Sequence, residues 1–200
     1  MSRSATGPDL VVFSRHAHSQ LNAEHRINGD PARPVLITET GKEQARMLGL
    51  ELAGIPISLC LHTRFGRTQE TAALALAGRG IPFEVEPLFD DLAVGELEGV
   101  TVDEFREWKR QHARADPFPG GESLVGAARR YADAFRRVLE CEERCVLVVC
   151  HEIPIRYALN AVGGSDDLDG PAHAIPNATP FLFDGAAIAV AAERIEALSG

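Results

Sequence analysis

The segment Val146–Cys150 limits the possible folds of this chain most strongly, because it is apolar at every position. A strand that is apolar throughout is usually covered on both faces, as strands of parallel sheets are. Further β-rich runs predict more strands, and Ile188–Ala191 is a weaker candidate. The stronger runs are Leu10–Ser14, Ile57–His62, Phe83–Leu88 and Phe181–Phe183.

Helical patterns lie between these runs. Thr40 with Glu43, and Thr101 with Glu104, have the spacing of a capping box at a helix start. A third helix is predicted to begin near Ser123, a good N-cap residue, and a fourth near Pro154. Strands that alternate with helices predict an α/β fold with a mostly parallel sheet and helices on both faces.

The length of 200 residues suits one domain, expected over residues 9–200 after a disordered lead over residues 1–8. No apolar run approaches the roughly 20 residues that span a bilayer, so no membrane partner is expected. The N-terminus lacks the apolar core of a signal peptide. The four cysteines form no CxxC pair, which indicates buried free thiols and a cytoplasmic location.

The charge of the chain restricts its partners. The formal net charge is −9, and the sequence shows no basic stretch, so a nucleic-acid partner is not expected. The overall field would also repel anionic ligands at long range. Any site for an anion must therefore be a local cluster of cations.

The connections after the predicted strands contain the candidate site. In open α/β sheets, ligands bind beyond the carboxyl ends of the strands. The connection after the first strand has roughly 25 residues, a length that usually marks a functional loop. Arginines, histidines and acids follow four of the runs: Arg15, His16, Arg64, Arg67, Asp90, Asp91 and His151.

This set of side chains fits phosphoryl transfer through a phosphohistidine. A neutral imidazole attacks phosphorus, and guanidinium groups hold the phosphoryl oxygens through paired hydrogen bonds. A second imidazole stabilises the charge that spreads in the transition state. A carboxylic acid protonates the oxygen that leaves.

Five motifs in this order resemble the histidine phosphatase superfamily, which includes cofactor-dependent phosphoglycerate mutases and many small phosphatases. Arg15, His16, Ser19 and Asn22 match its opening motif. The others resemble the stretches Thr63–Ala72, Asp91–Gly99, Pro119–Ser123 and Val149–Glu152.

The resemblance implies a role for each of these residues. His16 would be the nucleophile, Asp91 the acid and His151 the second histidine. Arg67, and not Arg64, would bind phosphate together with Arg15. Further phosphate contacts are expected from Ser19, Asn22 and His151. The resemblance also implies one antiparallel edge strand in the sheet.

The chain departs from the family pattern at four positions. Ala17 and Glu152 stand where glycine is usual, Asp91 replaces a glutamate, and Leu97 replaces an aromatic residue. A carboxylate at Glu152 should repel phosphate, although it could pair with Arg156 four residues later on a helix. Burial in the pocket and the neighbouring charge of Asp90 are expected to raise the pKa of Asp91, and Glu98 is the next candidate for the acid.

Two alternatives use different chemistry. Cys150 and Arg156 fit the Cys-x5-Arg pattern of cysteine-dependent phosphatases, but Pro154 removes a loop donor of that site. A non-catalytic binder of phosphorylated ligands is suggested by Ala17 and Glu152.

We therefore predict a phosphomonoester hydrolase that needs no metal or cofactor, since no zinc-type spacing is present. Its partner would be a small phosphorylated molecule, and the protein a monomer or homodimer. A mutase is the main alternative; no insertion over residues 100–120 supplies a phosphoglycerate clamp, but Arg110 and Arg114 keep this possibility open. Residues 23–39 and 100–120 are expected to set specificity.

Overall fold

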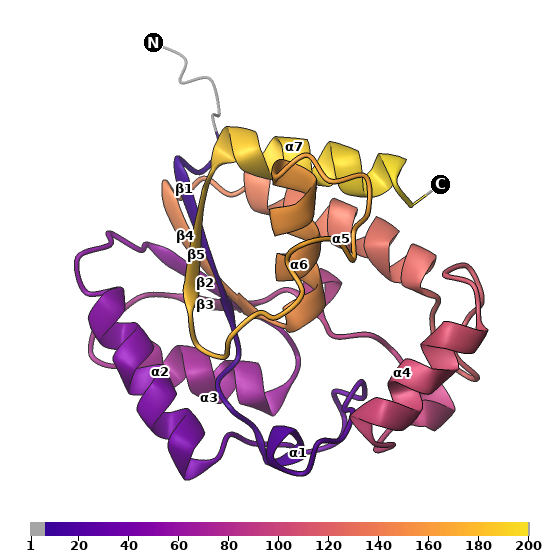
Figure 1. The fold of residues 1–200 in the computed structure, drawn as a ribbon. Coiled ribbons are helices and arrows are strands. Elements are labelled where there is room, and N and C mark those ends of the chain that lie inside the picture. The colour runs from indigo at the N-terminus through magenta and orange to yellow at the C-terminus, as the bar shows by residue number, and fades with distance from the viewer. Residues whose placement is uncertain (1–6, 200) are drawn as a thin grey trace.

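The computed structural model describes residues 7–199, and its centre is a five-stranded sheet in the order β3-β2-β4-β1-β5 (Figure 1). The first four strands are parallel, and β5 runs antiparallel to β1 at one edge. The expected mostly parallel sheet with one antiparallel edge strand is confirmed. The strands are β1 (Leu10–Arg15), β2 (Leu59–His62), β3 (Phe83–Val85), β4 (Cys145–Cys150) and β5 (Pro180–Asp184).

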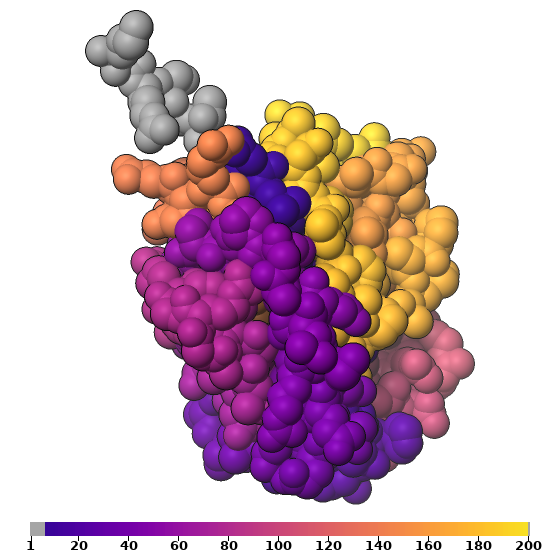
Figure 2. All heavy atoms as spheres, turned by 90° about the vertical axis from the view of Figure 1, so that its left-hand side faces the viewer, coloured from indigo at the N-terminus to yellow at the C-terminus, as the bar shows by residue number. Residues whose placement is uncertain are grey.

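Helices cover both faces of the sheet, and the alternation of side chains along β1 explains why. Val11 and Phe13 pack into the apolar cluster under α5, α6 and α7, whereas Val12 packs into the cluster under α2 and α3. Figure 2 looks onto the second face, which α2 crosses in purple with the α3 segment beside it in magenta. The helices are α1 (Gln20–Ala23), α2 (Glu39–Glu51), α3 (Gly66–Ala75), α4 (Val102–Gln111), α5 (Leu124–Leu139), α6 (Glu152–Val162) and α7 (Gly185–Ala197).

The helix starts agree only partly with their predictions. The capping box of Thr101 and Glu104 is present at α4, and Ser123 caps α5. The start predicted at Thr40 is wrong, because Thr38 is the N-cap of α2 and accepts a hydrogen bond from Gly41 N. Helix α6 begins at Glu152, two residues before Pro154.

The weak strand predicted at Ile188–Ala191 is also wrong, since this segment lies within α7. Asp184 ends β5 and caps the helix by accepting a hydrogen bond from Ala187 N at 2.7 Å. The alanine-rich sequence after this cap has a high helix propensity. The run predicted over Phe83–Leu88 is a strand only to Val85, and a 3-10 turn over Pro87–Phe89 follows it.

The long connection between β1 and α2 contains α1 and lies with α4 beyond the carboxyl ends of the parallel strands (Figure 1). No helix within residues 7–199 has the length and hydropathy needed to cross a membrane. Of the lead predicted over residues 1–8, residues 1–6 lie outside the described part of the chain. Gly7 and Pro8 are described, and Pro8 is buried.

Candidate active site

Sheet register brings the two candidate histidines together. Arg15 at the end of β1 pairs with Cys150 at the end of β4, so His16 and His151 leave neighbouring strands at the same level. Their ring centroids lie 5.4 Å apart. The backbone N–H of His16 donates to Cys150 O at 2.9 Å, which fixes this arrangement. The switch in strand order between β1 and β4 thus forms the ligand-binding crevice expected of such a sheet.

The hydrogen bonds of His16 determine which of its ring nitrogens can react. Its Nδ1 lies 2.8 Å from the carbonyl oxygen of Ala17, which can only accept, so Nδ1 carries the proton. Nε2 makes no hydrogen bond within residues 7–199 and keeps its lone pair. Burial, together with the positive charges of Arg67 and Arg15, lowers the pKa of His16 well below its ordinary value. The ring is therefore neutral at neutral pH, as a nucleophile must be.

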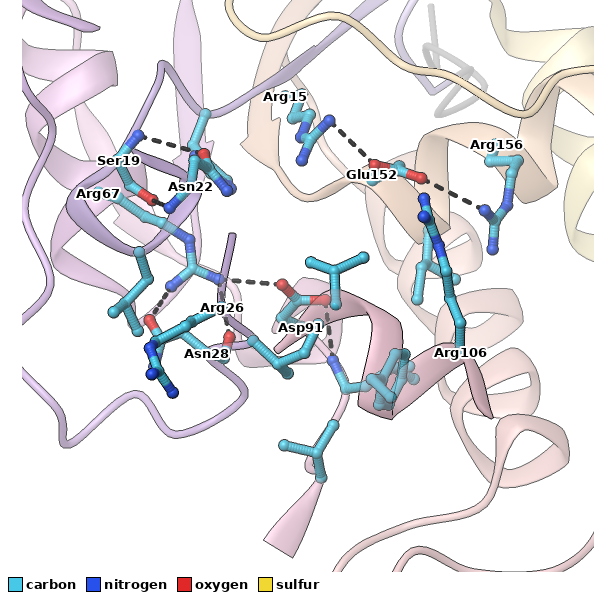
Figure 3. Close-up of a pocket in the computed structure, with 18 of the residues that line it drawn as sticks. Arg15, Ser19, Asn22, Arg26, Asn28, Arg67, Asp91, Arg106, Glu152 and Arg156 are labelled. Atoms are coloured by element: carbon cyan, nitrogen blue, oxygen red, sulfur yellow. Dashed lines mark hydrogen bonds and ion pairs between the residues drawn. The ribbon is translucent and has the colours of Figure 1, made fainter. Parts of the chain in front are cut away.

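Arg67 is buried and held in place by several groups at the start of α3. Its Nη1 donates to Asn28 Oδ1, and its Nη2 donates to Asn28 O at 3.1 Å and to Asp91 Oδ2 at 2.9 Å (Figure 3). The guanidinium also stacks over the ring of Phe65, 4.3 Å from its centroid. Arg64, by contrast, turns to Asp90, with 2.6 Å between Nε and Oδ2. The geometry therefore separates Arg67 from Arg64, as the motif suggested.

Asn28 was not among the site residues predicted from the sequence. Its Nδ2 donates to Glu98 Oε1 at 3.0 Å, and Glu98 also accepts from the backbone N–H groups of Gly29 and Asp30. Glu98 thus shapes the loop that holds Arg67. Glu98 does not line the cavity, so it is not placed to act as the alternative acid.

The carboxylate of Asp91 lies between the cation of Arg67 and the ring of His151. Its Oδ2 is 3.3 Å from His151 Nδ1, and its Oδ1 accepts from Leu92 N at 3.0 Å. Burial raises the pKa of Asp91 above its ordinary value, against the opposing effect of Arg67, and Glu152 raises it further. Asp90, whose charge was expected to raise the pKa of Asp91, is instead paired with Arg64.

His151 is completely buried and forms the wall behind Asp91. Its Nε2 lies 3.0 Å from Thr63 Oγ1, and its Nδ1 lies 3.2 Å from Arg67 Nη2, a donor. Nδ1 thus lies within reach of both Arg67 Nη2 and the Asp91 carboxylate, whereas Nε2 faces the hydroxyl of Thr63. Burial and the charge of Arg67 lower the pKa of His151 well below its ordinary value.

Glu152 is paired twice, which explains how a carboxylate is tolerated beside the candidate phosphate ligands. Its Oε2 lies 2.9 Å from Arg15 Nη1, and its Oε1 lies 3.3 Å from Arg156 Nη1 (Figure 3). The predicted pair with Arg156 is thus present. Arg15 Nη1 also donates to Ile175 O at 2.7 Å, whereas its Nη2 has no hydrogen-bond partner among residues 7–199.

The remaining motif residues also have clear positions. Ser19 caps α1 in a capping box with Asn22, and both line the cavity. Ala17 is buried, has no positive φ and donates its N–H to Thr71 Oγ1 at 2.9 Å, so glycine is not required there. Leu97 packs against the apolar core and does not line the cavity.

A cavity of about 380 Å³ contains the predicted residues Arg15, His16, Ser19, Asn22, Arg67 and Asp91 in its lining. His151 contacts this set from behind, and His18 and His62 do not line the cavity. Five further basic side chains complete the lining, and of these the sequence singled out only Arg156. The loops expected to set specificity contain three of the five. The five are Arg26, Arg106, Lys109, Arg156 and His173. Within residues 7–199, no three His, Cys, Asp or Glu side chains gather as metal ligands.

Asn177 is a second residue that the sequence did not indicate. Its Nδ2 donates to the carbonyl oxygen of His16 at 2.7 Å, and the next residue, Ala178, donates its N–H to Arg15 O at 2.9 Å. Ala178 holds this turn at a positive φ of 48°. Asn177 thus fixes the backbone of the candidate nucleophile.

We expect Asn177→Ala to lower kcat about tenfold with little change in KM, because the His16 backbone loses its fixed position. Steady-state kinetics with a phosphate monoester, beside a thermal unfolding curve, measures this. Asn177→Asp has the same shape without the donor and should lose at least as much. An Asp variant with full activity would contradict a positioning role.

Comparison with known proteins agrees with this geometry. The sequence profile of the histidine phosphatase superfamily, branch 1, matches residues 11–184. The chain belongs to this superfamily. Among curated relatives, the probable phosphoglycerate mutase GpmB of Cronobacter sakazakii is 31% identical over 137 residues, 65% of this chain and 63% of that protein. GpmB of Escherichia fergusonii is 28% identical over 162 residues, 77% of this chain and 74% of that protein.

Solved structures support the same fold. The alpha-ribazole phosphatase of Shigella flexneri superposes with a TM-score of 0.74 over 88% of this chain and 90% of its own, at 22% identity. This superposition shows a shared fold. The histidine phosphatase fold therefore positions the cavity and its two histidines at the ends of β1 and β4.

Proposed function

We propose that this histidine phosphatase superfamily member hydrolyses small phosphomonoesters through a phosphohistidine at His16, without a metal ion. The state of His16 is the observation that carries the proposal. Its Nδ1 is tied to Ala17 O, its Nε2 has no partner among the described residues, and its pKa is lowered. A neutral nucleophile beside two arginines that line one cavity fits attack on a phosphate ester.

In the first half of the reaction, His16 Nε2 forms a bond to phosphorus as the bond from phosphorus to the ester oxygen breaks. Arg15 and Arg67 bind the phosphoryl oxygens, and Asp91 gives its proton to the leaving oxygen. In the second half, a water molecule attacks the phosphohistidine and Asp91 takes a proton from it. Inorganic phosphate leaves, and His16 and Asp91 return to their starting states.

Asp91 occupies contacts that a bound phosphate also needs. The Asp91 carboxylate accepts from Arg67 Nη2 and lies 3.3 Å from His151 Nδ1. A bound phosphate dianion would take these contacts and add negative charge beside Asp91. Both changes raise the pKa of Asp91 further, so substrate binding favours the protonated acid that the first step needs.

We expect Asp91→Asn to slow alkyl phosphates about a hundredfold or more, and activated aryl phosphates less than tenfold. A poor leaving group needs the proton from Asp91, whereas a nitrophenolate leaves without it. Comparison of kcat for glycerol 3-phosphate and p-nitrophenyl phosphate tests this. Equal slowing of both substrates would make Asp91 a positioning residue.

We also expect kcat for an alkyl phosphate to fall as the pH rises through the pKa of Asp91, because the proton donor is lost above it. That pKa is raised from its ordinary value near ~3.9, so the fall moves toward neutral pH. The lowered pKa of His16 keeps the nucleophile neutral below pH 7. A pH profile of kcat should therefore show an acidic to near-neutral optimum, and an alkaline optimum would contradict this assignment.

A mutase is the second candidate, since the curated relatives are named probable phosphoglycerate mutases. Arg110 lines an outer hollow, whereas Arg114 is bound by Asp169 and Tyr157. Product analysis with 3-phosphoglycerate separates the two activities, because a phosphatase yields glycerate and inorganic phosphate and a mutase yields 2-phosphoglycerate. Turnover of any phosphate ester by the pure protein would exclude a non-catalytic binder.

The geometry does not favour a cysteine nucleophile. Cys150 is fully buried in β4, and burial raises the pKa of its thiol, which opposes the thiolate that attack needs. Arg156 is taken by Glu152 and Asp169.

A further inference from the structure

The cavity at His16 adjoins a second hollow of about 630 Å³. Four basic side chains line both spaces and therefore lie where the two meet: Arg106, Lys109, Arg156 and His173. The phosphate ligands Arg15 and Arg67 line only the inner space. The combined site therefore has two separate groups of cations, one at the nucleophile and one at the outer end.

Lys109 has no counter-charge of its own. Its Nζ has no carboxylate within 4.0 Å and makes no hydrogen bond to any part of residues 7–199 that the structure describes. It lies over the ring of Phe105, 5.2 Å from the centroid, and burial lowers its pKa. A half-buried ammonium group without a partner gains more from a bound anion than an exposed one does.

The acids that surround Lys109 are already engaged with other cations. Glu152 is shared by Arg15 and Arg156, and Asp169 is shared by Arg156 and Arg114. Asp103 lies 3.5 Å from Arg106 in an exposed pair, which contributes little. The junction therefore has an excess of positive charge on a chain whose net charge is −9.

Helix α4 presents these cations together with apolar groups. Val102, Phe105 and Lys109 have helical spacings of three and four residues, so they share the face of α4 that lines the cavity. Arg106 adjoins this face, and Figure 3 shows its side chain extending from α4 toward the side of the pocket that contains Arg156. A ligand along this wall would place carbon atoms against Val102 and Phe105 and an anionic end at Lys109.

We propose that the substrate has a second anionic group, a carboxylate or a second phosphate, which Lys109 and Arg106 bind while Arg15 and Arg67 hold the transferred phosphoryl group. This inference rests on the proposed phosphatase function and names the substrate class of the same site. The substrate is then a small carbon skeleton with an anion at each end.

Matched substrates test the proposal through phosphate release. In the first pair, 3-phosphoglycerate has a carboxylate where glycerol 3-phosphate has an alcohol. In the second pair, fructose 1,6-bisphosphate has one phosphate more than fructose 6-phosphate. We expect kcat/KM to be about tenfold or more higher for the more anionic member of one pair, as a charge-assisted hydrogen bond implies. The pair that shows the preference identifies the group as carboxylate or phosphate.

Lys109→Gln should remove this preference by lowering kcat/KM for the more anionic member of the preferred pair about tenfold more than for its less anionic partner. The matched control is Lys42→Gln, since the chain has two lysines and Lys42 is paired with Glu39 at 2.6 Å on α2. The control should keep the preference. Equal rates within both pairs, or equal losses for all substrates in Lys109→Gln, would overturn the proposal. Absence of turnover with every ester, including p-nitrophenyl phosphate, would instead refute the phosphatase function.

A binding measurement gives a readout that does not depend on turnover. In the His16→Ala protein with ¹³C-dimethylated amines, Lys42 and Lys109 supply the two lysine signals, assigned with the Gln variants. We expect the more anionic member of the preferred pair to shift the Lys109 signal and the less anionic member to leave it in place. The Lys42 signal should not move. Identical Lys109 responses to both members would contradict the second-anion site.

Discussion

His16→Ala is expected to abolish both phosphate-ester turnover and covalent labelling of the protein by phosphate. The variant removes the Nε2 lone pair that attacks phosphorus, and no second group replaces it: His151 is completely buried, and its Nε2 is turned to Thr63. Rate loss should reach the limit of detection, on the order of 10⁴-fold or more. The reaction with a ³²P-labelled ester is stopped during turnover, and the protein is then treated with acid or with base. The label that remains on the protein after each treatment measures the phosphohistidine.

The matched control for this experiment is His112→Ala. His112 is exposed, bonds to Trp108 O at 2.7 Å and does not line the cavity, so its loss should leave both activities unchanged. An acid-labile phosphohistidine that still formed in His16→Ala would transfer the nucleophile to another histidine. Cys150→Ser, made in parallel, should retain labelling.

Arg67→Ala should lower kcat/KM about a thousandfold. The phosphoryl oxygens lose a donor that is buried and fixed before substrate binds, which is the situation in which such donors contribute most. The variant also leaves the Asn28 side-chain oxygen and the Asp91 carboxylate without their shared cation. Steady-state kinetics with p-nitrophenyl phosphate gives the loss, and a thermal melt shows how much of the protein is folded at the assay temperature.

Two further variants separate the causes of that loss. Arg67→Lys keeps the charge but not the planar set of donors, and should recover part of the activity. Arg64→Ala is the matched control in the same motif, because Arg64 is bound to Asp90 and does not line the cavity. A larger loss in Arg64→Ala than in Arg67→Ala would reverse the assignment of the phosphate ligand.

Much of the fold follows from local sequence patterns. The segment VLVVC is apolar at every position and rich in valine, which predicts a strand, and β4 is indeed buried on both faces. Ile188–Ala191 shows where such reasoning fails. A short apolar run fits a strand or a buried helix equally well, and only the cap at Asp184 and the packing of α7 on α5 and α6 select the helix.

The candidate site divides in the same way. The sequence by itself predicted Arg15, His16, Arg67, Asp91 and His151, because they stand in motifs that resemble the family and that follow strands whose carboxyl ends meet at one edge of the sheet. Asn177 and Asn28 were decided only by the tertiary structure, because their contacts to His16 and Arg67 join segments 161 and 39 residues apart.

The identity of the carboxylate that raises the pKa of Asp91 was likewise decided by the fold. Asp90 is the sequence neighbour of Asp91, but its carboxylate is bound to Arg64. Glu152 on α6 lines the cavity instead and raises the pKa of Asp91. Lys109 has no local signal either, since a lysine on an amphipathic helix is ordinarily a solvated side chain. The sequence determines which groups follow each strand, but orientation, burial and charge pairing depend on contacts between distant segments, and only the folded chain supplies these.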